Sequence, residues 1–152
     1  MLLRKEVCEN LRLFSTMLAK LTCFKSYDIR GELNKNFDPK ICYKIARAFA
    51  SVLNAKRMIV GRDGRASSPT LLDSICDGLL AQGVEVLDIG LAGTEEMYWA
   101  TSQYGASGGI EVTASHNPIN FNGLKLVKSG STPVSSDELL EIKQKAELSH
   151  FI

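Results

Sequence analysis

Three side chains with different chemistry stand next to one another in a polar segment of the chain. Ser115 carries a hydroxyl group, His116 an imidazole ring and Asn117 an amide. The segment 108–118 that contains them begins with two glycines, which permit close approach to the backbone, and ends with a proline, which fixes the chain direction. A serine hydroxyl held among amides and a nearby cation could accept and release a phosphoryl group.

The residue types leave three interpretations of Ser115 open. A hydrolase nucleophile would need the pattern G-x-S-x-G, which is absent, and His116 is poorly placed as its base because neighbouring strand residues point to opposite faces. A turn serine that bonds to a backbone amide is the second interpretation. A serine that carries a phosphoryl group is the third, and spacing alone does not choose among them.

Alternating strands and helices are predicted around this segment. Short apolar runs indicate strands at 58–60, 84–89, 109–113 and 124–127, and the stretch 22–31 is expected to be extended or irregular. Helical spacing and capping residues indicate helices that begin after Asp38, at Ser67 or Ser68, at Thr94 and at Glu138. This alternation is typical of an open α/β sheet with helices on both faces, which binds ligands at the C-terminal edge of its strands.

Composition places the chain among ordinary soluble globular domains. It has 152 residues, of which 45% are hydrophobic and 23% charged, and this length corresponds to one domain. With 18 basic and 17 acidic residues its net charge is +1, which argues against a nucleic-acid partner. Its apolar runs are far shorter than the roughly 20 residues that cross a bilayer, so no membrane partner is expected.

The cysteines and the N-terminal residues indicate a reducing compartment. The four cysteines form no C-x-x-C pair, which argues against a zinc ribbon or a thioredoxin-like motif. Charged residues interrupt the stretch where a secretory signal would be apolar, so we expect a cytoplasmic protein with reduced thiols. Residues 1–20 are expected to be an N-terminal extension, and a start at Met17 would leave residues 1–16 outside the native protein.

Several segments together resemble the α-D-phosphohexomutase superfamily. Its active-site serine signature resembles T-A-S-H-N-P at 113–118. The other similar segments, in the same order along the chain, are F-K-S-Y-D-I-R-G at 24–31, V-G-R-D-G-R at 60–65, S-S-P at 67–69, D-I-G at 88–90 and N-G-L-K at 122–125. They cover residues 21–134, and the variant A-G-T-E-E at 92–96 is most similar to bacterial phosphomannomutases, which feed GDP-mannose and surface-polysaccharide synthesis.

The resemblance implies both a fold and a reaction. We expect a three-layer α/β/α domain over residues 21–150, with a mixed sheet of about four strands, the last of them antiparallel. The implied reaction interconverts mannose 6-phosphate and mannose 1-phosphate: a phosphoserine at Ser115 gives its phosphoryl group to the substrate and forms a bisphosphorylated sugar. Hexose phosphates would be the partners, and magnesium bound to the phosphate on Ser115 would stabilise the charge of the transferring group.

Two cations match catalytic positions of the family. Lys125 matches a lysine implicated in general acid–base work near the reacting hydroxyl, with a solvated lysine at a strand end as the alternative. Arg30 matches an arginine near the same centre, and its planar guanidinium suits phosphate. A structural ion pair of Arg30 with Asp28 or Asp63 is the alternative.

The remaining predicted site residues are Tyr27, His116, Asn117 and Asn122. His116 matches a loop position that contacts the phosphoserine or the substrate, with a structural hydrogen bond as the alternative. Tyr27 would shape the same site, with a packing role as the alternative. Asn117 and Asn122 lie within the similar motifs and are expected to help bind substrate or phosphate.

Other polar and aromatic residues are given structural roles. For Arg62 and Arg65, a network through Asp63 that stabilises the turn is favoured over a phosphate clamp. Trp99 is predicted to lie in the core or to anchor a helix. The predicted core consists of Ile45, Phe49, Ile59, Leu72, Ile75, Leu79, Val86, Ile89, Ile110, Val112 and Leu126.

Complete members of the family have further domains, one of which supplies a D-G-D-x-D-R loop whose aspartates complete the magnesium site. This chain has no D-x-D pair, so its own magnesium site is expected to be incomplete. It would then be the nucleophile-bearing domain of a mutase, inactive alone, or else a truncated remnant with at most weak sugar-phosphate binding. A fragment of a phosphoglucomutase or phosphoglucosamine mutase is a further alternative, because the later domains largely determine sugar specificity.

Overall fold

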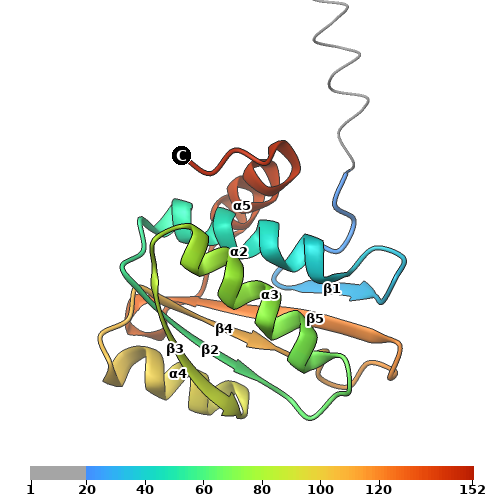
Figure 1. Cartoon of the computed structure of the whole chain (residues 1–152), viewed down its shortest axis with the longest axis horizontal. Coiled ribbons are helices and arrows are strands. Elements are labelled where there is room, and N and C mark those ends of the chain that lie inside the picture. Colours follow the sequence, from blue (N-terminus) through green and yellow to red (C-terminus); the bar gives the residue numbers. More distant parts are fainter. Residues whose placement is uncertain (1–19) are drawn as a thin grey trace, which may run out of the picture.

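The computed structural model describes residues 20–152, so the predicted extension at 1–20, apart from Lys20, and the alternative start at Met17 lie outside the described residues. In the described part, a five-stranded sheet has helices on both faces (Figure 1). The strands are β1 (Ile29–Glu32), β2 (Arg57–Arg62), β3 (Glu85–Leu91), β4 (Gly108–Val112) and β5 (Phe121–Lys128). The helices are α2 (Pro39–Leu53), α3 (Ser68–Ala81), α4 (Thr94–Gln103), α5 (Ser136–Leu148) and the short η1 (Ser129–Ser131). The predicted α/β/α class is confirmed.

The sheet is mixed, with the strand order β1-β5-β4-β2-β3. β2 pairs in parallel with both β3 and β4, whereas β5 runs antiparallel to β4 and to β1. The antiparallel direction predicted for the last strand is therefore confirmed.

The sheet has five strands instead of about four because β1 forms where the stretch 22–31 was expected to be extended or irregular. β1 has only four residues, in which buried Ile29 and Gly31 alternate with partly exposed Arg30 and Glu32. It is stabilised by pairing with β5, which is distant in the sequence. Such a short strand has no clear local pattern, so only the tertiary contact reveals it.

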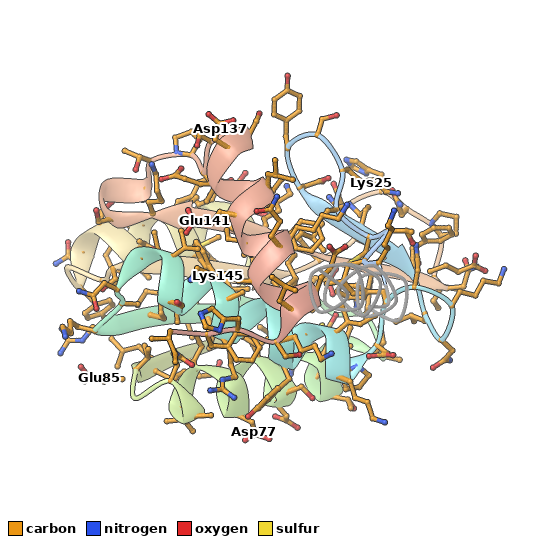
Figure 2. The ribbon with its side chains drawn as sticks, turned by 90° about the horizontal axis from the view of Figure 1, so that it is seen from above. Lys25, Asp77, Glu85, Asp137, Glu141 and Lys145 are labelled. Atoms are coloured by element: carbon orange, nitrogen blue, oxygen red, sulfur yellow. The ribbon has the colours of Figure 1, made fainter. Side chains whose placement is uncertain are left out.

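The two faces of the sheet are covered unequally. α2, α3 and α5 lie on one face and α4 lies on the other (Figure 1). The larger apolar cluster lies under the three helices, and a smaller one, which includes Ile59, Met97 and Val127, lies under α4. Figure 2 looks onto the larger helical layer and shows α5 beside α2, with Asp137, Glu141 and Lys145 following one another along α5.

Most of the predicted core residues are buried. The buried ones are Ile45, Phe49, Ile59, Leu72, Ile75, Leu79, Ile110 and Val112. Val86, Ile89 and Leu126 are only partly buried and pack against the two clusters. For Val86 and Ile89 the reason is their place on β3, which is one of the two edge strands of the sheet and has a neighbouring strand on one side only.

The prediction that Trp99 packs in the core is wrong. Its side chain is 62% exposed, and its ring meets the ring of Tyr104 edge-on, with 6.2 Å between the ring centroids. The buried face of α4 consists of Met97, Ala100 and Thr101. At 100° per residue, position 99 lies on the opposite side of the helix from 97 and 101, so Trp99 faces outward.

The helices begin at or within two residues of their predicted starts. Asp38 is the N-cap of α2, and its carboxylate accepts a hydrogen bond from the backbone N–H of Ile41 at 2.8 Å. α5 begins at Ser136, two residues before its predicted start, because Ser135 and Glu138 form a reciprocal capping box. Within residues 20–152, no helix is both long and apolar enough to cross a membrane.

Candidate functional site

The candidate site lies where β2 and β4 end. These two strands are parallel neighbours, so the segments that follow them emerge at the same edge of the sheet. The backbone N–H of Asp63, just after β2, donates to the carbonyl of Val112 at the end of β4, with 2.9 Å between nitrogen and oxygen. This hydrogen bond joins the two segments where they leave the sheet, so the turn that contains Ser115 begins beside the segment 63–68.

Ser115 lies at an exposed position in a turn with left-handed backbone geometry. Its φ angle is +54°, which is unusual for a residue with a side chain. Its backbone N–H donates to the hydroxyl oxygen of Thr113 at 3.0 Å. A non-glycine residue in this conformation costs of order 1–3 kcal/mol and persists only where surrounding contacts fix it.

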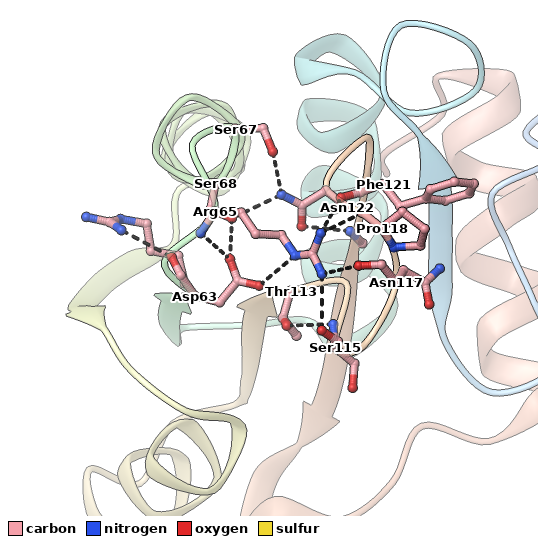
Figure 3. Close-up of polar contacts among 12 residues, drawn as sticks. Asp63, Arg65, Ser67, Ser68, Thr113, Ser115, Asn117, Pro118, Phe121 and Asn122 are labelled. Atoms are coloured by element: carbon pink, nitrogen blue, oxygen red, sulfur yellow. Dashed lines mark hydrogen bonds and ion pairs between the residues drawn. The ribbon is translucent and has the colours of Figure 1, made fainter.

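Arg65 supplies most of those contacts (Figure 3). Its guanidinium donates to four backbone carbonyl oxygens, those of Ser115 at 3.1 Å, Asn117 at 2.6 Å, Pro118 at 2.8 Å and Phe121 at 3.2 Å. The same group forms an ion pair with Asp63 at 3.3 Å. The predicted structural network through Asp63 is confirmed for Arg65, whose guanidinium fixes the turn around Ser115.

Asp63 connects this network to the start of α3. Its carboxylate accepts hydrogen bonds from the hydroxyl of Ser68 at 2.6 Å and from the backbone N–H of Arg65 at 3.1 Å. Burial alone would raise the pKa of Asp63, but the hydrogen bonds and the charge of Arg65 outweigh burial and hold that pKa below its usual value. Asp63 is therefore a carboxylate at neutral pH and a stable partner for Arg65. Arg62 takes a smaller part, with one bond to the carbonyl of Asp63 at 3.2 Å.

Asn122 is part of the same network and is fully buried. Its amide nitrogen donates to the hydroxyls of Ser67 at 2.8 Å and Ser68 at 3.0 Å, and its amide oxygen accepts from the backbone N–H of Gly123 at 2.9 Å. These bonds hold β5 to the beginning of α3. The contact with substrate or phosphate predicted for Asn122 would require this arrangement to open.

Arg30 reaches the segment before Ser115 from β1. Its guanidinium donates to the carbonyl of Thr113 and forms an ion pair with Asp28 at 2.7 Å. Both the structural ion pair and the position near Ser115 are thus present. Gly123 makes this position possible, because a Cβ atom there would lie 2.9 Å from the Arg30 guanidinium and 2.2 Å from the carbonyl oxygen of Ile29.

Asn117 lies beside Arg30, whereas Tyr27 does not. Arg30 and Asn117 line an open hollow of about 320 Å³, together with Lys25, Lys35 and Glu32, and the last two form an ion pair at 2.9 Å. Tyr27, with 89% of its side chain exposed, lines a separate hollow against α5.

His116 and Lys125 complete the predicted set. His116 is exposed in the turn directly after Ser115. Lys125 is partly exposed on β5 and, within residues 20–152, forms no ion pair. Its direct neighbour across the β4–β5 ladder is Glu111.

The sequence interpretation missed Glu111, which is 1% exposed although it carries a carboxyl group. Burial, followed by the charges of Asp63 and Glu96, raises the pKa of Glu111 from 4.5 to about 8. The signal was a single ionisable residue within the apolar strand G-G-I-E-V at 108–112. Its environment depends on two neighbouring strands, so the local pattern could not reveal it.

The described residues do not form a magnesium site by themselves. Within residues 20–152, no three or more His, Cys, Asp or Glu side chains come together in a way that could hold a metal ion. Magnesium normally needs about six oxygen ligands, shared among carboxylates, phosphate and water. A phosphate on Ser115 would supply one part of such a set, and the residues present do not supply the rest.

Comparisons with known proteins point to one family. The family model for "Phosphoglucomutase/phosphomannomutase, alpha/beta/alpha domain I" matches residues 21–151. A phosphomannomutase of Klebsiella pneumoniae is 49% identical over 135 residues, covering 88% of this chain and 86% of that protein. A phosphomannomutase of Escherichia coli is also 49% identical over 135 residues, and there the match covers only 30% of the relative.

The structural comparison agrees. A phosphoglucomutase/phosphomannomutase family protein from Burkholderia thailandensis superposes with a TM-score of 0.79 at 35% identity, over 89% of this chain and 31% of that one. This chain therefore spans about 30% of the length of the longer relatives it matches.

Proposed function

Because this chain belongs to the phosphoglucomutase/phosphomannomutase family, we propose that it is the nucleophile-bearing domain of a phosphomannomutase. The observation that carries the proposal is the geometry of Ser115: its side chain is exposed in a turn whose backbone Arg65 and Thr113 hold in place. A nucleophile that must meet a substrate and then be regenerated needs both exposure and a fixed position.

In the proposed reaction, a phosphoryl group on Ser115 passes to the free hydroxyl of a hexose phosphate. The bond between phosphorus and the serine oxygen breaks as the bond to the sugar oxygen forms, which gives a bisphosphorylated sugar. The other phosphate of that sugar then returns to Ser115, so mannose 6-phosphate and mannose 1-phosphate interconvert. Magnesium, when bound by the complete protein, would stabilise the charge on the transferring group.

The other site residues have supporting roles in this proposal. Lys125 would move the proton of the reacting sugar hydroxyl, and Arg30 would pair with phosphate oxygens. Asn117 and His116 would bind substrate or the phosphoserine. The hollow that Arg30 and Asn117 line has three cations, Arg30, Lys25 and Lys35, and one acidic residue, Glu32, which is paired with Lys35, and the excess of cations supports an anionic ligand there. Tyr27 and Asn122 are further proposed contacts.

Activity is proposed for the complete protein, and the isolated domain is proposed to be inactive. The observation that favours this is the lack of a metal-holding group of side chains within residues 20–152. A remnant that binds sugar phosphates weakly is the second candidate, and the same observation favours it. The expected compartment remains the cytoplasm, as predicted from the sequence.

A chimera tests the proposal. Residues 21–151 of this chain replace the matching segment of the E. coli phosphomannomutase, and the product is assayed with mannose, glucose and glucosamine phosphates. We expect mannose phosphate to be converted, and conversion to be lost in Ser115→Ala. A folded chimera that converts none of these sugars would favour the remnant. Because the later domains of the chimera come from the E. coli enzyme, the sugar is tested by the same assay on a complete protein that contains this domain, where conversion of glucosamine phosphate alone would refute the mannose assignment.

A further inference from the structure

Glu111 is a buried ionisable group for which neither the fold nor the proposed reaction has an obvious use. It is the fourth of the five residues of β4, with 1% of its surface exposed. Neither oxygen of its carboxyl group has a hydrogen-bond partner among residues 20–152. Buried polar atoms in native proteins are nearly always paired, so an orphaned carboxyl group is a sign of a specific role.

The fold provides a defined space for this carboxyl group. Gly61 on β2 is the direct neighbour of Glu111 across the parallel ladder. A Cβ atom at position 61 would lie only 2.5 Å from one Glu111 oxygen and 3.1 Å from Ile89. The Glu111 side chain therefore lies over the bare backbone of β2, in a space that exists because residue 61 is a glycine.

Lys125 is the direct neighbour of Glu111 on the other side, across the antiparallel ladder to β5. Directly opposed residues project from the same face of a sheet with Cβ atoms about 4.5–5.5 Å apart, so a lysine side chain can reach the carboxyl group. Neither group has an ion-pair partner among the described residues.

Apart from Lys125, the charged groups with the largest effects on Glu111 are acidic. Asp63 follows β2, and Glu95 and Glu96 lie in the first turn of α4. Burial is the largest effect and raises the pKa of Glu111, the three carboxylates raise it further, and Lys125 lowers it. Among the described residues, Lys125 is thus the cation with the largest effect on Glu111, and its ammonium is the natural partner of the Glu111 carboxylate.

We propose that Glu111 is a positioning residue that acts through Lys125, the two side chains forming one coupled pair on the α4 face of the sheet. The functional meaning rests on the proposed mutase reaction, in which Lys125 moves a proton. When Glu111 is a carboxylate, it holds the ammonium in place and keeps it charged. When Glu111 is a neutral acid, it places no negative charge beside the site of an incoming phosphate and leaves the lysine freer to give up its proton.

A titration of the 152-residue chain by nuclear magnetic resonance tests this coupling without any need for turnover. The carboxyl carbon of Glu111 is followed against pH in the wild-type chain, in Lys125→Met and in Lys40→Met. Lys40 is an exposed residue of α2, on the opposite face of the sheet, so its replacement removes one positive charge without touching the pair. Amide spectra verify that each variant is folded.

The expected result is a Glu111 midpoint near pH 8 that rises by about one unit, a tenfold change in proton affinity, in Lys125→Met only. An unchanged Glu111 midpoint in folded Lys125→Met would overturn the proposal.

The coupling and the proposed function can fail separately. An inactive chimera, together with a Glu111 midpoint that rises in Lys125→Met as expected, would count against the mutase assignment alone. An active chimera together with an uncoupled Glu111 would count against the pair alone.

Discussion

The guanidinium of Arg65 donates a hydrogen bond to the backbone carbonyl of Ser115 at 3.1 Å, although the two residues are 50 positions apart in the chain. The same guanidinium reaches three more carbonyls of the turn. One side chain from the end of β2 therefore determines the course of the backbone around the proposed nucleophile. Arg65 is paired with Asp63 and satisfies four carbonyls, so its role is to hold the loop.

The first prediction concerns this role. Arg65→Lys keeps the charge but loses the planar fork, and a lysine ammonium has only three donors at one point. We expect the free energy of unfolding to fall by about 1–3 kcal/mol, because carbonyls of the turn lose their partners. Urea unfolding measures this fall. Arg62→Lys is the matched control, since Arg62 has only one bond to a neighbouring carbonyl, and an equal loss in both variants would contradict the role of Arg65.

The second prediction concerns the space for Glu111. Gly61→Ala places a methyl group 2.5 Å from a Glu111 oxygen, and we expect a loss of about 1–3 kcal/mol from overpacking. When Glu111→Ala is already present, adding Gly61→Ala should cost much less stability. Gly64→Ala is the control, because a Cβ atom there meets only a Leu91 methyl group at 4.0 Å. The steric account is wrong if thermal unfolding shows Gly61→Ala and Gly64→Ala to be equally stable.

The third prediction concerns the pH dependence of stability. Burial and acidic neighbours raise the pKa of Glu111 from 4.5 to about 8, so between these values the folded chain holds a proton that the unfolded chain releases. The contribution of Glu111 therefore lowers the free energy of unfolding progressively as the pH rises from about 5 to 8. Glu111→Met should be more stable relative to wild type at pH 8 than at pH 5, as measured by urea unfolding. Glu141→Met, which removes an exposed carboxylate from α5, controls for the loss of charge. A stability difference that does not change with pH would refute the assignment.

The elements with strong local signals could be predicted from the sequence. Asp38 and Pro39 indicate the start of α2, and the apolar runs around 58–60 and 109–113 indicate the two parallel strands whose ends form the site. The position of Ser115 at the C-terminal edge of the sheet follows from the same pattern.

The features that the sequence did not reveal depend on distant partners. β1 becomes a strand only because it pairs with β5. Trp99 suggests a core residue by its type, yet the buried side of α4 is filled by smaller neighbours. The four carbonyl contacts of Arg65 and the burial of Glu111 require the spacing of β2, β4 and β5, which no local pattern contains.

The mass of the protein shows whether Ser115 carries the phosphoryl group. The chimera with residues 21–151 is incubated with hexose phosphate, and its intact mass and phosphopeptides are determined. We expect a mass addition of about 80 Da that maps to Ser115 and is absent, together with activity, in Ser115→Ala. An active chimera with an unmodified Ser115, or a Ser115→Ala variant that still converts hexose phosphates, would show that Ser115 is not the phosphoryl carrier.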